Sequence, residues 1–117
     1  MKESILLIKS KTFAIKIIHL YKYLTDEKRE FIMSRQLLRS GTSVGANIRE
    51  AKFAQSMPDF ISKMSIALKE MSETQYWLEL LTETGYLNKN EAEKLTEDST
   101  ELIKMLHATV KTSKQNL

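Results

Sequence analysis

The chain contains very few residues that interrupt a helix, with only three glycines and one proline in 117 residues. A sheet of comparable size needs many tight turns, and most turns are built with glycine or proline. The sequence therefore predicts an all-α fold of long helices. Because 42% of the residues are hydrophobic, residues 1–117 can form one hydrophobic core, and a single domain is expected.

Hydrophobic residues recur at helical spacing in four segments. The first segment is expected to be helical over residues 4–24 and the second over residues 28–55. Their buried stripes are predicted to be Leu6, Phe13, Ile17, Leu20 and Leu24, and Leu37, Gly41, Val44, Ile48 and Ala51. The stripes of the third and fourth segments are predicted to be Phe60, Met64, Leu68, Met71 and Leu78, and Leu95, Leu102, Met105, Leu106 and Thr109.

The third and fourth segments carry start and stop signals. Ser56 supplies a capping hydroxyl, Pro58 lies in the first turn, and an acid follows three residues after the cap. Gly85 can adopt the left-handed conformation that commonly ends a helix, and Asn88 or Asn90 can cap the next one. Four helices joined by short polar turns predict an up-down-up-down antiparallel four-helix bundle.

The second segment contains a run of small residues, 40–47, whose helix propensity is low. A phosphate-binding glycine loop is one interpretation, but the lysine and the spacing of a P-loop are absent. The run also keeps the helical phase of Leu37 and Ile48. We therefore favour close helix packing, in which Gly41 and Gly45 let a neighbouring backbone approach.

Charge is unevenly distributed along the chain. Residues 1–56 contain eleven lysines and arginines against five acids, and residues 57–117 contain seven against ten, so the halves carry +6 and −3. This asymmetry is compatible with a polyanion-binding face, with head-to-tail contacts between subunits, or with ordinary solubility.

Basic side chains are expected to form a ridge on the second helix, opposite its apolar stripe. The predicted nucleic-acid-binding residues are Lys28, Arg35, Arg39 and Arg49, which fall within an arc of about 80°. Because the planar donor fork of arginine suits phosphate, such a ridge could follow a nucleic-acid backbone through mainly electrostatic contacts. The alternative is a solvated face, paired with acids of the third or fourth helix of a neighbouring subunit.

The third helix carries a second apolar set on the side away from its buried stripe, and Ile8 and Ile15 resemble it on the first helix. The predicted oligomer-interface residues are Ile66, Trp77, Leu80 and Leu81. Exposed apolar patches mark interfaces, where aromatic side chains are enriched. Self-association is therefore expected, unless terminal segments or a wide core cover these side chains.

Several chemistries lack the residues that they require. The absence of cysteine excludes disulfides and thiolate chemistry and suits a reducing cytoplasm. His19 and His107 follow lysine, not glutamate, at the third preceding position, so the Glu-x-x-His pairs of di-iron bundles are absent. Helically spaced glutamates are interpreted as surface residues, not metal ligands: Glu70 and Glu73, and Glu97 and Glu101.

Neither catalysis nor membrane insertion is indicated. No serine or threonine can be placed beside an activating base, so we expect neither an enzyme nor a cofactor or small-molecule substrate. No apolar stretch approaches the length of a membrane span, and the short run 5–8 is closed by lysines, unlike an export signal. A soluble, cytoplasmic protein is expected.

Residues 36–51 read QLLRSGTSVGANIREA, and the third helix contains DFI at 59–61, IALKE at 66–70 and ETQYWL at 73–78. These segments resemble the 23S rRNA intervening-sequence protein family, with Gln75 where glutamate would be expected. The resemblance implies a bacterial bundle assembled as a ring-like homopentamer. It also implies a likeness to the accessory variability determinant proteins of diversity-generating retroelements, which suggest nucleic-acid binding through basic faces.

Two hypotheses follow. The leading one is a cytoplasmic homo-oligomer that binds RNA or another nucleic acid through the basic ridge. The rival is a structural or adaptor protein that assembles with itself and a protein partner. In the rival, the ridge merely matches acids on the third and fourth helices.

Overall fold

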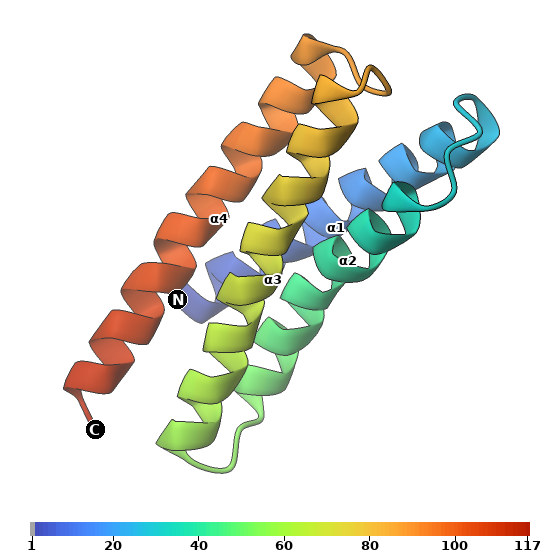
Figure 1. The fold of residues 1–117 in the computed structure, drawn as a ribbon. Helices are drawn as coiled ribbons and strands as arrows, with labels where there is room; N and C mark the ends of the chain where they lie inside the picture. The colour runs from blue at the N-terminus through green and yellow to red at the C-terminus, as the bar shows by residue number, and fades with distance from the viewer. Residues whose placement is uncertain (1) are drawn as a thin grey trace.

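The computed structural model describes residues 2–117, with side chains from residue 5 onward, as four helices in antiparallel succession (Figure 1). The helices are α1 (Lys2–Asp26), α2 (Met33–Lys52), α3 (Met57–Glu83) and α4 (Lys89–Gln115). The bundle measures 47 × 20 × 20 Å. The predicted all-α, up-down-up-down bundle is confirmed.

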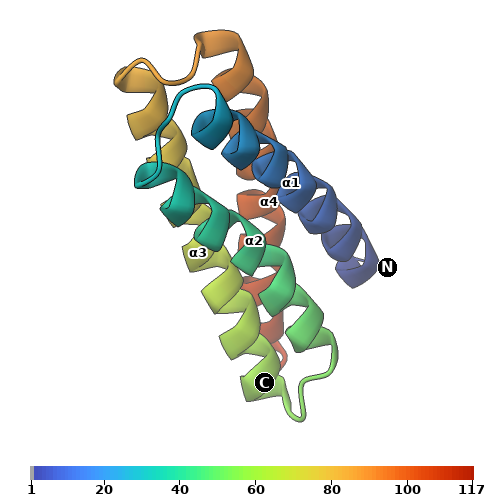
Figure 2. The same ribbon diagram turned by 90° about the vertical axis from the view of Figure 1, so that its right-hand side faces the viewer.

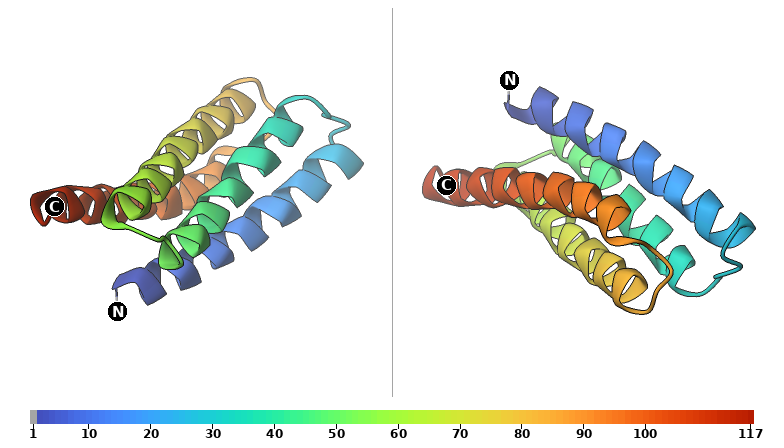
Figure 3. Two further views of the ribbon diagram at one scale, coloured as in Figure 1. Left: turned by 90° about the horizontal axis from the view of Figure 1, so that it is seen from below. Right: turned by 90° about the horizontal axis from the view of Figure 1, so that it is seen from above.

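The bundle consists of two hairpins, α1–α2 and α3–α4, that meet mainly through α2 and α3. The contact between α1 and α4 is much smaller. In Figure 2 the N-terminal end of α1 stands apart from α3 and α4, although Lys9 and Lys16 of α1 still reach acids of α4. Figure 3 shows the same separation at this end of α1. The outer face of α1 is therefore less covered than that of a helix in a closed bundle.

The predicted apolar stripes form the core with few exceptions. Phe13, Ile17 and Leu24 of α1 are fully or almost fully buried, as are Leu37 and Ile48 of α2. Half-buried members of the predicted stripes lie at the edge of this core: Phe60, Leu68, Met105 and Thr109.

The helix boundaries after residue 53 agree with their sequence signals. The Ser56 hydroxyl accepts a hydrogen bond from the Asp59 backbone N–H at 3.2 Å, which caps α3. Asn88, rather than Asn90, caps α4 in a capping box with Glu91. Gly85 has a φ of 88° just after α3, a conformation that favours glycine.

The start of α2 differs from the prediction, because the helix begins at Met33 and not at residue 28. Arg29 has a φ of 55°, which is left-handed and interrupts the helical path. The carboxylate of the next residue, Glu30, then accepts hydrogen bonds from backbone N–H groups at the start of α2. Lys28 consequently lies in the α1–α2 loop, so its predicted position on a helical ridge is wrong.

The small residues of α2 lie against α1. A Cβ atom added at Gly41 would stand 2.9 Å from Ile17 Cγ2, and one added at Gly45 would stand 3.3 Å from Ser10 Oγ. Both Ile17 and Ser10 are buried. A side chain at position 41 would therefore clash with Ile17, so the close approach of α1 and α2 requires glycine there. At position 45 the contact is longer and is made to the Ser10 hydroxyl, which adjusts more easily to an added Cβ.

The second apolar set of α3 divides between core and surface. Leu81 is fully buried, so the expectation that the monomer exposes it is wrong. It follows buried Leu78 by three residues and therefore shares that residue's helix face. Trp77 and Leu80 are half-buried, and only Ile66 of the set is clearly exposed.

Candidate nucleic-acid interface

The four predicted nucleic-acid-binding residues do not form one ridge. Arg35 and Arg49 are exposed on α2, and neither has an ion-pair partner among the residues that the structure describes. Lys28 is exposed in the loop before α2, with its Nζ 6.0 Å from the ring centre of Tyr23. Arg39 occupies the predicted face but is engaged within the fold.

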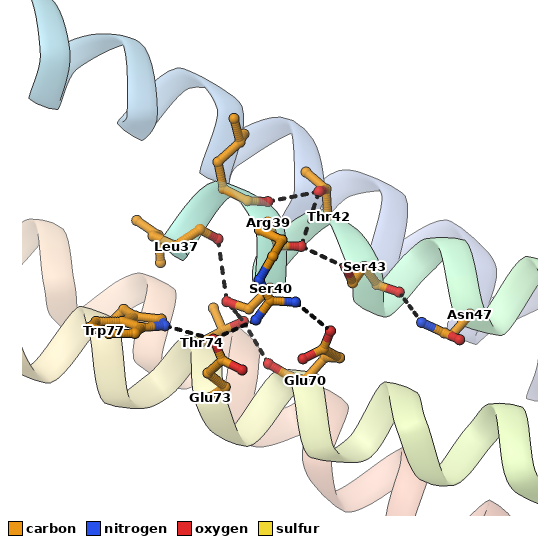
Figure 4. Close-up of polar contacts among 11 residues, drawn as sticks. Leu37, Arg39, Ser40, Thr42, Ser43, Asn47, Glu70, Glu73, Thr74 and Trp77 are labelled. Carbon is orange, nitrogen blue, oxygen red and sulfur yellow. Dashed lines mark hydrogen bonds and ion pairs between the residues drawn. The ribbon is translucent and has the colours of Figure 1, made fainter. Parts of the chain in front are cut away.

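Arg39 joins α2 to α3 through two carboxylates (Figure 4). One guanidinium nitrogen donates to Glu70 Oε2 at 2.9 Å, and the other donates to Glu73 Oε2. Trp77 Nε1 donates to the same Glu73 oxygen at 2.9 Å. The hydrogen bonds from Trp77 and Arg39 lower the pKa of Glu73 below its usual value. Arg39 is thus a structural cation whose charge is largely compensated.

A shallow groove between α1 and α2 places Arg49 near the α1 lysine Lys11. The groove has a volume of about 360 Å³, and Thr42 contributes to its wall. Leu7, Gly45 and Ala46 also line it. Two exposed cations therefore flank a groove whose lining is otherwise uncharged.

The α1–α2 hairpin as a whole presents a positive surface. Among its exposed side chains, seven cations have no ion-pair partner in the described part of the chain: Lys11, Lys22, Lys28, Arg29, Arg35, Arg49 and Lys52. Among the side chains described from residue 5 onward, the exposed acids of the hairpin are Asp26, Glu27 and Glu50. The charge excess predicted from the sequence is therefore displayed on the surface.

The α3–α4 hairpin has a different charge balance, because acids and lysines are equally numerous among its exposed side chains. A groove of about 790 Å³ runs between its two helices over Leu78 and Ala92. Five acids and two lysines line this groove: Glu79, Glu83, Glu93, Glu97, Glu101, Lys89 and Lys104. No group of three or more histidine, aspartate or glutamate side chains in the described residues is arranged to hold a metal ion.

The loop between α1 and α2 carries residues that sequence reasoning did not select. Arg29 lies over the ring of Phe31, with the guanidinium carbon 5.4 Å from the ring centre. Phe31 is 47% exposed and Ile32 is 80% exposed. The sequence contained a signal for this group, because cations stand next to an aromatic residue in Lys28-Arg29-Glu30-Phe31. The signal was missed because these residues were predicted to lie within the second helix and not in a loop.

None of the four helices is long and apolar enough, over the residues described, to cross a lipid bilayer.

Comparisons with known proteins identify a family and solved structures that are similar to this chain. A family model described as 23S rRNA-intervening sequence protein matches residues 2–108. A crystal structure at 1.70 Å resolution, described as a protein with unknown function from the S23 ribosomal protein family of Bacteroides thetaiotaomicron, is 54% identical. The alignment covers 95% of this chain and 99% of that chain, with a TM-score of 0.93. No curated protein is significantly similar to the chain.

Proposed function

Because the chain belongs to the 23S rRNA-intervening sequence protein family, whose solved relative has no known function, we propose a function from the surface of this chain. We propose that it is a non-catalytic, self-associating bundle that binds nucleic acid, RNA in particular, through the exposed cations of the α1–α2 hairpin. The binding surface is centred on Arg35, Arg49 and Lys11.

The observation that carries this proposal is the excess of cations on the α1–α2 hairpin, where, among the side chains described from residue 5 onward, seven exposed cations without an ion-pair partner stand against three exposed acids. Unpaired surface cations can release condensed counterions from a polyanion, which is the main source of non-specific nucleic-acid affinity. Arg39 is not part of this surface, because Glu70 and Glu73 already neutralise it. The contacts would be to phosphates, so little sequence preference is expected.

The test compares the double variant Arg35→Glu/Arg49→Glu with the wild type by fluorescence anisotropy on labelled RNA at two salt concentrations. Two lost phosphate contacts should weaken binding at least about tenfold at low salt. They should also reduce the slope of log affinity against log salt by about two. Arg39 is left unchanged, because replacing it would disturb the α2–α3 contact and confuse folding with binding.

The matched control is Lys94→Glu/Lys111→Glu, which changes the net charge equally on exposed positions of α4. We expect this control to retain most of the wild-type affinity. Equal losses in both double variants would mean that net charge alone, and not the α1–α2 surface, governs binding. No binding of RNA by the wild type would contradict the proposal.

The rival adaptor function is favoured by one specific observation, the engagement of Arg39 by acids of α3. In that case the basic surface would serve contacts within and between proteins. The exposed isoleucines Ile8 and Ile15 on α1 support self-association under either function. For the assembly we propose the homopentamer that the family resemblance implies.

A further inference from the structure

The loop at the α1–α2 end of the bundle places cations beside two aromatic rings, the exposed ring of Phe31 and the half-buried ring of Tyr23. We call residues 26–32, together with Tyr23 and Arg35, the aromatic tip. Two cations of the tip lie over aromatic rings, Lys28 over Tyr23 at 6.0 Å and Arg29 over Phe31 at 5.4 Å. A planar guanidinium resting on a half-exposed phenyl ring offers a flat surface of the kind on which nucleobases stack.

The tip is held in shape by the backbone on both sides. The Glu30 N–H donates to the Leu24 carbonyl at 2.9 Å, which closes the end of α1. The Glu30 carboxylate accepts from the backbone N–H groups of Ile32, Met33 and Ser34 at 3.1, 2.9 and 2.8 Å. Because these bonds fix the loop before any ligand arrives, binding there should cost little ordering entropy.

Charge at the tip is nearly balanced. Glu30 is only 8% exposed and its carboxylate is directed to α2, so the exposed charges are those of Asp26, Glu27, Lys28, Arg29 and Arg35. Their sum is only +1. Selectivity at the tip would therefore come from stacking rather than from counterion release.

We propose that the aromatic tip binds unpaired nucleotides, with a base stacked on Phe31 and Arg29 and with Lys28 and Arg35 near the phosphates. This inference rests on the proposed nucleic-acid function and adds a ligand class to it. Bases in a duplex are stacked on one another, so only single strands, loops and ends present a free face to such a ring. The protein should prefer single-stranded RNA over a duplex of the same sequence.

The test measures binding of the wild type and of Phe31→Ala to labelled RNA of about 12 nucleotides, offered as a single strand or as a duplex, at two salt concentrations. Removing the Phe31 ring should weaken binding of the single strand about tenfold and should leave binding of the duplex unchanged. Because stacking involves no release of counterions, the loss in single-strand affinity should be the same at low and at high salt. Phe53→Ala is the matched control, because Phe53 is 76% exposed at the other end of α2 with Lys52 Nζ 5.9 Å from its ring. Arg29→Asn should weaken single-strand binding as well, because it removes the guanidinium that lies over the Phe31 ring. The loop should keep its shape in this variant, since asparagine tolerates the left-handed conformation of residue 29.

The outcomes separate the inference from the function on which it rests. Wild-type protein that binds single strand and duplex equally, with no effect of Phe31→Ala, would overturn the inference and leave the proposed function standing. A wild type that binds neither RNA would remove both. If Phe31→Ala instead abolished co-sedimentation with phosphatidylserine vesicles and left RNA binding intact, the tip would be a membrane contact and the inference would be wrong.

Discussion

Glu30 is the residue whose environment differs most from its appearance in the sequence. It is an acid between a positive-φ arginine and an exposed phenylalanine, yet it is 8% exposed and accepts three backbone N–H groups at the start of α2. Burial acts to raise its pKa, but the hydrogen bonds from Met33, Ser34 and Ile32 outweigh burial and lower it. A carboxylate there also interacts favourably with the positive end of the α2 dipole.

We predict that Glu30→Gln lowers the free energy of unfolding by about 1–2 kcal/mol at pH 7, because an amide carries one acceptor where the carboxylate has two. The folded-state pKa of Glu30 is below its unfolded value. Its contribution is therefore complete above the unfolded pKa and is lost as the pH falls through the folded pKa. Urea unfolding followed by circular dichroism should show the difference between variant and wild type shrinking between pH 7 and pH 3.

Glu27→Gln provides the control for Glu30, because Glu27 is exposed in the same loop and no hydrogen bond to its carboxylate is present in the described structure. Its effect should stay within about 0.5 kcal/mol. If both variants lost the same stability, general loop charge and not the cap would explain the result.

At the scale of elements, the α1–α2 contact depends on the absence of a side chain at Gly41. Alanine there would gain about 1 kcal/mol of helix propensity. Its Cβ would, however, stand 2.9 Å from Ile17 Cγ2 and 3.0 Å from Cγ1, and Ile17 is fully buried. We predict that Gly41→Ala is destabilising by about 1–3 kcal/mol in chemical denaturation.

Gly45→Ala is the contrasting variant, because its nearest neighbour is the Ser10 hydroxyl at 3.3 Å, which can rotate. Its net effect should be close to zero. The cost of Gly41→Ala should also decrease in an Ile17→Ala background, since the atoms that clash are gone, and a double-mutant cycle would measure this coupling. Additive effects would show that the two residues do not interact.

The elements themselves were largely predictable, and the exceptions have physical causes. The four helices, the Ser56 cap and the Gly85 stop follow from periodicity and capping chemistry within a few residues. The start of α2 was not predictable, because residues 28–32 have no strong helix breaker and the cap is a glutamate side chain from outside the helix. The role of Arg39 was likewise hidden, since its partners Glu70 and Glu73 are on another helix and pairing between helices leaves no local pattern.

For the whole molecule, the uneven charge both exposes a basic surface and provides ion pairs between the two hairpins. The ion pairs that the structure gives for residues 5–117 all join the α1–α2 hairpin to the α3–α4 hairpin. Lys9 and Lys16 reach Glu101 and Asp98 across the narrow α1–α4 contact at 3.2 and 2.8 Å. These partly exposed pairs contribute little energy each, so their main effect is to select this arrangement of hairpins over others.

The outer face of α1 exposes more apolar surface than a monomer requires. Its isoleucine stripe consists of Ile5, Ile8, Ile15 and Ile18, which are 45%, 66%, 45% and 37% exposed. Along a helix these residues extend over about 20 Å, which is a substantial part of an interface. Exposed Lys11 and Lys22 lie on the same outer face, and the groove between α3 and α4 of another copy, with five acids against two lysines, has the complementary charge.

We therefore predict that the wild type has a solution mass that is a multiple of 13.6 kDa, fivefold for a pentamer, and that Ile8→Glu/Ile15→Glu reduces it to the monomer. Burying two carboxylates in an apolar interface is unfavourable by several kcal/mol, which is enough to dissociate a typical assembly. Light scattering after size exclusion measures the mass, and circular dichroism confirms that the variant is folded. Ile32→Glu is the control, because Ile32 is more exposed but lies outside the stripe. An unchanged mass in the double variant would place the interface elsewhere, with exposed Ile66 on α3 as the next position to alter.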